Sequence, residues 1–335
     1  MTRIVDAHLH VLDRCWVPTG MREAWARQAV GRRVNGPSAD ELEPRVMVRQ
    51  SDPSGELTLA AWDRLGVEAG VIPVVDWTVV AGPRENDISI EQLHDRHEDL
   101  FESSDRRLLF CAGLDPRHSN AREIAERSLQ RPGCVGFKLY PSAGWKLDDP
   151  AHSWVFEFAH EHDRPLVIHT APLGGDPNVT PNSRPAALAQ RMSEFPEIAW
   201  VFGHAGFEAW WLEAIDIATG WQRAYLDLSL WQRSADFDYP EFRKRVRLAL
   251  LRVGAHRIMF GSDIIRGPGD DADGADLERW IDQFQSLAEP YEGQPAVFSN
   301  EQLELAMAGT ALDLYRIDEV RSETTRSHTN GVSAS

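Results

Sequence analysis

The chain has 335 residues, of which 42% are hydrophobic and 26% charged, the balance of a globular protein that can bury a substantial core. Its 52 acidic and 35 basic side chains give a net charge of −17, which argues against nucleic acid and anionic membranes as partners. No run of eighteen apolar residues is present, so we expect no membrane-spanning helix. Charges and histidines in the N-terminal MTRIVDAHLH stand where a signal peptide would be apolar, which favours a cytoplasmic location.

Eight short apolar runs recur along the chain and are separated by longer amphipathic segments. Each run is nearly continuous in Val, Ile, Leu and Phe, as expected for strands of a parallel sheet that is buried on both faces. Their starts are mostly about 25 to 38 residues apart, the size of a βα unit, so the sequence predicts a closed (β/α)8 TIM barrel. An open doubly wound sheet is the alternative, but no GxGxxG follows the first run. The predicted strands are Ile4–His10, Val71–Trp77, Leu108–Leu114, Val135–Tyr140, Leu166–Thr170, Trp200–His204, Tyr225–Ser229 and Ile258–Asp263.

The segments between these runs carry apolar residues at helical spacing. We therefore expect helices at Leu57–Leu65, Ala121–Leu129, Trp154–His162, Arg184–Phe195, Glu208–Ala218, Pro240–Arg252, Leu277–Ala288 and Glu301–Leu314. Pro73 is unusual inside a central strand because it lacks an N–H donor, so a bulge or a strand start is expected there.

Residues 11–56 break this rhythm, and we call them the cap segment. They show no strand pattern and are rich in proline and glycine. Because they follow the first strand, they leave the barrel at its C-terminal face, where active sites of this fold lie. We expect a lid over the active site, with a long loop that only seals the barrel end as the alternative. The barrel should span residues 1–318, and the aperiodic residues 319–335 are expected to be disordered.

Ionisable residues end four of the predicted strands. His8 and His10 alternate at the end of the first strand, so both should point into the barrel mouth. His169 and His204 end the fifth and sixth strands, and Asp263 ends the eighth. Burial there penalises charged and polar groups unless they have a partner. Neutral imidazole and carboxylate suit zinc and its neighbours, so the pattern predicts a metal site.

The ordered motifs VDAHLH, GFKLYP, LVIHTAP, VFGHAG and FGSDI resemble the amidohydrolase superfamily, and most closely its amidohydrolase family 2. That branch includes aminocarboxymuconate semialdehyde decarboxylase, resorcylate-type decarboxylases and several lactonases. The resemblance runs from about residue 3 to residue 315 and is weakest in the cap segment.

The resemblance implies that His8, His10, His169 and Asp263 bind a divalent metal, with zinc favoured and manganese or iron as alternatives. His204 would sit beside it as a further ligand, a substrate polariser or an acid/base group. The carboxylate at Asp263 would also take a proton from the water that the metal activates. Asp263 and His204 are therefore the expected catalytic residues.

Lys138, in the fourth strand, has three interpretations. A very similar stretch in binuclear members carries a carboxylated lysine that bridges two metals. A buried ammonium that contacts substrate and a structural ion pair are the other two. Tyr140, Trp145, Trp77 and Trp231 follow strands and could line the pocket, although packing beneath loops explains them equally well. The other histidines are expected at the surface without a role: His94, His97, His118, His152, His160, His162 and His256.

The expected activity is metal-dependent hydrolysis of an ester, lactone or amide of a small molecule by a metal-activated water. The alternative is non-oxidative decarboxylation of a small unsaturated or aromatic acid at the same site. A barrel that only binds a ligand would not need this full set of metal donors. A homodimer is compatible with the sequence, which does not identify the substrate.

Overall fold

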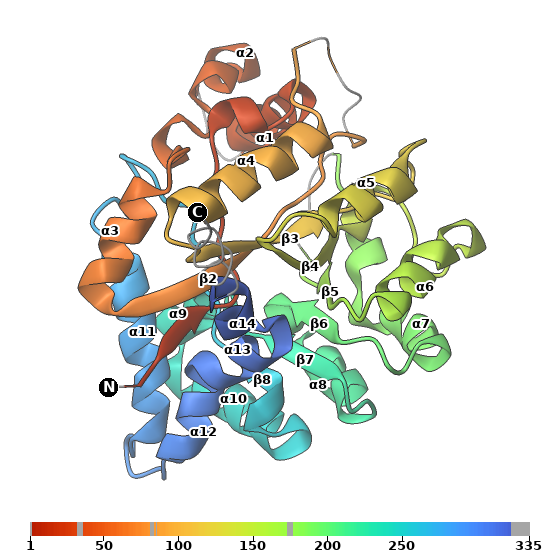
Figure 1. Cartoon of the computed structure of the whole chain (residues 1–335). Helices are drawn as coiled ribbons and strands as arrows, with labels where there is room; N and C mark the ends of the chain where they lie inside the picture. Colours follow the sequence, from red (N-terminus) through yellow and green to blue (C-terminus); the bar gives the residue numbers. More distant parts are fainter. Residues whose placement is uncertain (1, 32–35, 81–83, 85, 173–176, 323–335) are drawn as a thin grey trace, which may run out of the picture.

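The computed structural model describes residues 2–31, 36–80, 84, 86–172 and 177–322. Eight parallel strands pair in chain order, and helices surround them (Figure 1). The ring closes where the N–H of Ala7 donates to the carbonyl of Phe260 at 3.0 Å. The predicted TIM barrel is therefore confirmed. Its strands are β1 Ile4–Asp6, β2 Val67–Pro73, β3 Leu108–Gly113, β4 Cys134–Leu139, β5 Leu166–His169, β6 Trp200–Gly203, β7 Ala224–Asp227 and β8 Ile258–Met259.

The helices fall into an outer layer, a cap and a C-terminal group. The outer layer holds α3 Glu56–Leu65, α4 Ile90–Ser103, α5 Ala121–Ser128, α6 Ser153–Glu161, α7 Ala189–Glu194, α8 Trp211–Thr219, α9 Gln232–Phe237, α10 Tyr239–Val253 and α11 Ala275–Gln285. The cap segment contains α1 Thr19–Gly31 and α2 Ala39–Leu42, and the C-terminal group is α12 Asn300–Glu304, α13 Thr310–Tyr315 and α14 Ile317–Ser322. Among the described residues, none of these helices has the length and apolarity to cross a membrane.

Small apolar side chains fill the barrel. Val5, Val71, Val167 and Val201 belong to one buried cluster, to which the C-terminal helices also contribute, among others with Tyr315. Arg3, just before β1, pairs with Asp318 of α14, so these helices cover the end of the barrel where the strands begin. Polar side chains lie at the opposite end of the barrel, where the strands finish.

The second strand lies four residues earlier than predicted. It begins at Val67, and Pro73 is its last residue, so the expected bulge or strand start at Pro73 is wrong. The position of Pro73 fits its chemistry, because a missing N–H is tolerated at the end of a strand. The sequence predicts a later strand because the apolar run continues through Val74 and Val75, which are buried beyond the strand.

Helix α4 was not predicted, and two of its histidines were wrongly assigned to the surface. His94 and His97 are 0% and 1% exposed and face the core around Phe110. His152 is also buried, against Trp145. His118 is partly buried and contacts the carboxylate of Asp76 at 2.8 Å. The surface prediction is confirmed for three others, His160, His162 and His256.

The cap segment is largely helical and lies at the C-terminal ends of the strands. Its Leu12, Val17 and Met21 pack with Trp77, which follows β2, and with Ile265, which follows β8. This agrees with the expected position above the barrel mouth, while its role as a lid stays a prediction. The disordered tail was predicted too early, because α14 continues to Ser322; residues 323–335 lie outside the described part.

Candidate metal centre

The carboxyl ends of β1 and β8 are joined by the side chain of Asp6. Its carboxylate accepts hydrogen bonds from the backbone N–H of Ser262 (2.9 Å) and from the hydroxyl of Ser262 (2.6 Å). The carbonyl of His8 accepts two backbone hydrogen bonds, from Ser262 (2.9 Å) and Asp263 (2.7 Å). Asp263 itself has a left-handed backbone with φ of 53°, which aspartate adopts more readily than most residues. These contacts bring residues from both ends of the chain together.

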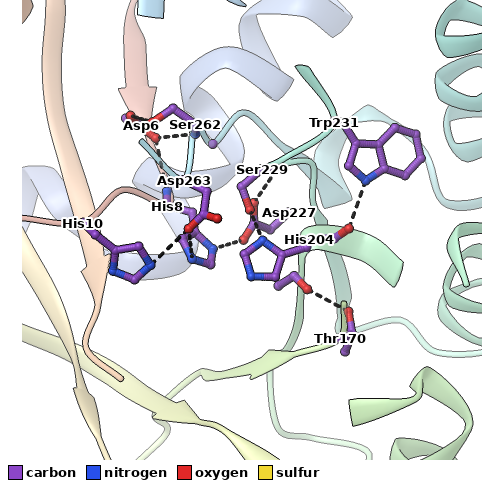
Figure 2. A network of polar contacts seen from close by, with 12 residues as sticks. Asp6, His8, His10, Thr170, His204, Asp227, Ser229, Trp231, Ser262 and Asp263 are labelled. Atoms are coloured by element: carbon purple, nitrogen blue, oxygen red, sulfur yellow. Dashed lines mark hydrogen bonds and ion pairs between the residues drawn. The ribbon is translucent and has the colours of Figure 1, made fainter. Parts of the chain in front are cut away.

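Three of the four predicted ligands meet at this point. Asp263 Oδ1 lies 3.0 Å from His10 Nε2 and 3.4 Å from His8 Nε2. The candidate ligand atoms of these three residues all lie within 4.8 Å of one another (Figure 2). His8 Nε2 is buried and has no hydrogen-bond partner among the described residues. A buried nitrogen without a partner is costly, and a cation at this position would remove that cost.

The predicted fourth ligand, His169, borders this group. Its ring centroid lies 4.8 Å from that of His204, which in turn lies 4.6 Å from that of His8. His169 Nε2 is also buried without a hydrogen-bond partner among the described residues. The structure therefore gathers all five predicted strand-end residues, with His8, His10 and Asp263 as the tightest group and His169 and His204 beside it.

Asp227, the last residue of β7, is a site residue that the sequence analysis missed. Its Oδ2 accepts a short hydrogen bond from His8 Nδ1, and both side chains are buried. A carboxylate in this role holds the imidazole in the tautomer whose Nε2 can bind a metal. Gly261 allows the close approach of β8, because a Cβ there would lie 2.8 Å from Asp227 Oδ1. The predicted strand Tyr225–Ser229 contained Asp227 in its interior, whereas the observed strand β7 ends at Asp227.

The β6 end that carries His204 is held on several sides. The carbonyl of His204 accepts a hydrogen bond from the indole N–H of Trp231 (2.9 Å), and its Nδ1 lies 2.8 Å from the hydroxyl of Ser229. The hydroxyl of Thr170 donates to the carbonyl of Gly203 (2.7 Å). His204 has a φ of 67°, a left-handed conformation that is uncommon for residues other than glycine and recurs at functional sites. Residues that follow β5 and β7 therefore hold this backbone, and Ser229 contacts the ring itself.

The electrostatics of the group favour an ionised carboxylate among neutral imidazoles. Burial would raise the pKa of Asp263, but the hydrogen bond from His10 and the nearby positive groups lower it to about 2. Burial lowers the pKa of His10, and it lowers the pKa values of His169 and His204 well below the ordinary range. Neutral imidazoles and a carboxylate are the protonation states in which these side chains bind metal. The residues present therefore fit a divalent cation.

Lys138 is buried at the same end of the barrel. Its Nζ lies 3.5 Å from the position that a Cβ on Gly203 would take, and the side chain is 1% exposed. Burial lowers the pKa of Lys138 to about 8, although the charges of Asp227 and Asp263 favour its protonated form. Within the described part of the chain, only burial and the charges of neighbouring groups act on this pKa, with no hydrogen bond to the ammonium group. Lys138 is thus a cation near two carboxylates without a fixed partner.

The four aromatic candidates differ in position. Tyr140 lies against the site, with its ring centroid 4.8 Å from that of His169. Trp77 packs on Trp25 of the cap segment at 5.3 Å. The other two, Trp145 and Trp231, are buried at 3% and 1% exposure, and their rings pack on His152 and Phe242. Trp231 reaches the site through its indole N–H, which donates to the carbonyl of His204 (Figure 2). Only Tyr140 is therefore brought to the predicted ligands by a ring contact.

A comparison with protein families identifies the family of this chain. A sequence model of a family described as amidohydrolase matches residues 5–317. No curated protein matches the sequence.

Three solved structures are similar over most of their length. One is 5-carboxyvanillate decarboxylase from Sphingomonas paucimobilis, with 17% identity, a TM-score of 0.67, and 94% of this chain and 99% of that chain covered. The second is 5-carboxyvanillate decarboxylase from Novosphingobium aromaticivorans with bound manganese, with 15% identity, a TM-score of 0.65, and 94% and 97% covered. An amidohydrolase from Burkholderia multivorans with bound zinc has 17% identity, a TM-score of 0.55, and 94% and 99% covered. Similarity at these identities shows the shared fold. Because the family match spans almost the whole chain, the protein belongs to the amidohydrolase family and is a metal-dependent enzyme.

Proposed function

We propose that this enzyme hydrolyses an ester, lactone or amide bond of a small molecule. The observation that carries the proposal is the position of Asp263. Its carboxylate is ionised, contacts His10 at 3.0 Å, and lies beside the partnerless Nε2 of His8. A hydrolase needs a proton acceptor at the point where water is activated, and Asp263 is that acceptor.

The metal would be held by His8, His10 and Asp263, with His169 as the neighbouring donor. When bound, a divalent cation polarises a carbonyl oxygen and lowers the pKa of a bound water to about 7. The mixed nitrogen and oxygen donors favour zinc, and manganese is the alternative. Elemental analysis of protein purified without chelators should find one of these metals.

The side chains of the chain have separate tasks around the substrate. Asp263 Oδ1 faces His10 and His8, which leaves Oδ2 to take the proton of the attacking water. The proton would then pass from Asp263 to the leaving group when the tetrahedral centre collapses. His204 and the ammonium of Lys138 are placed to stabilise negative charge on the substrate oxygen. Tyr140 would lie along the substrate beside His169.

Decarboxylation of a small unsaturated or aromatic acid is the second candidate, and Lys138 is the observation that favours it. A buried ammonium without a fixed partner could hold a substrate carboxylate. That reaction, however, must also deliver a proton to carbon. The pKa of Asp263 is lowered to about 2 and that of His204 well below its ordinary range, so neither the carboxylic acid nor the imidazolium form is favoured as the proton donor. Hydrolysis is therefore the better match.

A screen of lactones, esters, amides and aromatic acids in water enriched in oxygen-18 tests the proposal. We expect turnover of a carbonyl substrate with one heavy oxygen in the new carboxylate. The Asp263→Asn variant serves as the background control. Carbon dioxide release from an aromatic or unsaturated acid, without oxygen-18 incorporation, would replace hydrolysis by decarboxylation.

A further inference from the structure

Two residues at the end of β7 each reach the Nδ1 atom of a different histidine. Asp227 Oδ2 contacts His8 Nδ1, and Ser229 Oγ lies 2.8 Å from His204 Nδ1 (Figure 2). Asp227 Oδ1 also accepts the backbone N–H of Ser229 at 2.8 Å. All four side chains are at most 3% exposed. One short backbone segment therefore fixes the rings of two neighbouring histidines.

The hydrogens in these two contacts follow from what each partner can do. A carboxylate only accepts, so His8 Nδ1 carries the hydrogen, which leaves Nε2 as the nitrogen that can bind a cation. The hydroxyl of Ser229 has its own proton, which needs an acceptor because the side chain is fully buried. Within the described part of the chain, the acceptor in reach is His204 Nδ1. Ser229 therefore donates to His204 Nδ1, and the hydrogen of this imidazole must be on Nε2.

We propose that Ser229 is a positioning residue that holds His204 as its Nε2–H tautomer, so that His204 donates a hydrogen bond to the substrate oxygen rather than binding the metal. The substrate class is one whose oxygen gains negative charge during the reaction, such as the carbonyl of an ester, lactone or amide. This assignment of a role to His204 rests on the proposed hydrolysis.

The two histidines thus receive opposite tautomers from the same three-residue segment, Asp227–Ser229. A metal ligand needs a lone pair on the nitrogen that faces the ion, and Asp227 provides that for His8. A group that stabilises an oxyanion needs an N–H in the same place, and Ser229 provides that for His204. The ring centroids of His8 and His204 are 4.6 Å apart, so both nitrogens border one site.

Nitrogen-15 NMR of zinc-loaded protein labelled at histidine measures the tautomers directly. The His204 signals are identified as those that disappear in the His204→Gln variant. We expect a protonated Nε2 and an unprotonated Nδ1 for His204, and the reverse for His8. A His204 that is protonated at Nδ1 would overturn the proposal. Because this measurement needs no substrate, it decides the Ser229 assignment even if the hydrolysis proposed above is not found.

Kinetics of Ser229→Ala then test the consequence. We expect kcat to fall by about 10- to 100-fold, with little change in KM and in bound metal, because the lost contact orients a group that acts in the transition state. Ser128→Ala is the matched control: Ser128 is a buried serine 3.4 Å from Nδ1 of His94, away from the site, and its loss should leave kcat unchanged. Loss of metal in Ser229→Ala, or an unchanged kcat, would contradict the proposal. If Ser229→Ala does not fold, Ser229→Cys and the wild-type NMR result give the same decision.

Discussion

The carboxylate of Asp227 holds the imidazole of His8, a residue 219 positions earlier in the chain. This contact joins β7 to β1 across the mouth of the barrel, and both side chains are buried. It orients His8 so that Nε2 faces Asp263 at 3.4 Å. Asp227 thus orients the imidazole of His8 for metal binding, and this orientation does not depend on a bound cation.

The first prediction concerns this support. Asp227→Asn should weaken metal binding by about 10- to 100-fold, the usual cost of losing a carboxylate behind a metal-binding histidine. Competition with a calibrated chelator measures the change in affinity. Asp52→Asn is the matched control, because Asp52 is an equally buried carboxylate that accepts hydrogen bonds at the start of α3. It should lower the melting temperature and leave metal affinity unchanged. Equal metal affinity in both variants would show that Asp227 does not support metal binding.

The second prediction concerns the ligands on β1. The double replacement His8→Ala and His10→Ala should abolish retention of metal, because it removes two of the three donor atoms that lie within 4.8 Å of one another. Elemental analysis after dialysis measures this loss. Chelation should lower the melting temperature of the wild type, since an ion that binds only the folded state stabilises it. The double variant should show no such shift, and a metal-dependent shift there would place the ion elsewhere.

The third prediction separates catalysis from folding at Asp263. Asp263→Asn should lower turnover by about 10²- to 10⁴-fold, the contribution of a general base. The barrel should stay folded, because asparagine tolerates the left-handed backbone that this position requires. Circular dichroism and thermal melting check the fold, and single-substrate kinetics check turnover. Activity near the wild-type level with full metal content would mean that another group accepts the proton.

The sequence predicts the site where metal-binding residue types stand at the ends of apolar runs. Apolar runs ending in histidine or aspartate predicted both the strands and the five residues gathered at the mouth, because a parallel barrel brings all strand ends to one rim. Asp227 was missed because it lies inside the predicted run Tyr225–Ser229 rather than at its end, and a lone aspartate in AYLDLS lacks the companion histidine that HLH has. Its importance depends on His8, and that contact exists only in the folded chain.

Helix α4 is an element that the apolar pattern of the sequence does not predict. Its buried face is formed by Ile90, Leu93, His94, His97, Leu100 and Phe101, which is good helical spacing. Two of these six positions are histidines, so the apolar residues alone form an interrupted pattern. The same substitution of imidazole for an apolar side chain explains why His94 and His97 were wrongly placed on the surface.

The fourth prediction follows from this burial. Burial lowers the pKa of His94 to about 3 and that of His97 to about 4, below the ordinary 6.5 of an unfolded chain. Between pH 6.5 and about 4 the unfolded state therefore binds more protons, so the free energy of unfolding falls as pH falls. The slope is about 1.4 kcal/mol per pH unit for each histidine.

Urea unfolding of His97→Leu at pH 7 and pH 5 measures this effect. The wild type should lose roughly 2 kcal/mol more than the variant over this interval, because one titrating group has been removed. His160→Gln is the control, since His160 is exposed on α6 and should not change the pH dependence. An identical acid sensitivity of wild type and His97→Leu would show that His97 is protonated in the folded protein.

The fifth prediction decides between one metal and two. A carboxylated Lys138 would be an anion able to bridge two ions about 3.5–4 Å apart. We expect instead a free ammonium and one metal per chain, because the side chain lies near Asp227 and Asp263, whose charges favour its protonated form. Bicarbonate during reconstitution should then have no effect, and a short carboxylic acid should not rescue Lys138→Ala.

The pH dependence of activity is a second test of whether Lys138 is a free ammonium or a carboxylated bridge. The pKa of Lys138 is about 8, so its positive charge is present below that pH and is lost as the pH rises through it. If the ammonium stabilises the substrate oxygen, kcat/KM should decline above about pH 8 in the wild type. Lys138→Met should be slower at neutral pH and should lack this decline. Two equivalents of metal per chain, together with activation by bicarbonate, would instead identify Lys138 as a carboxylated bridge.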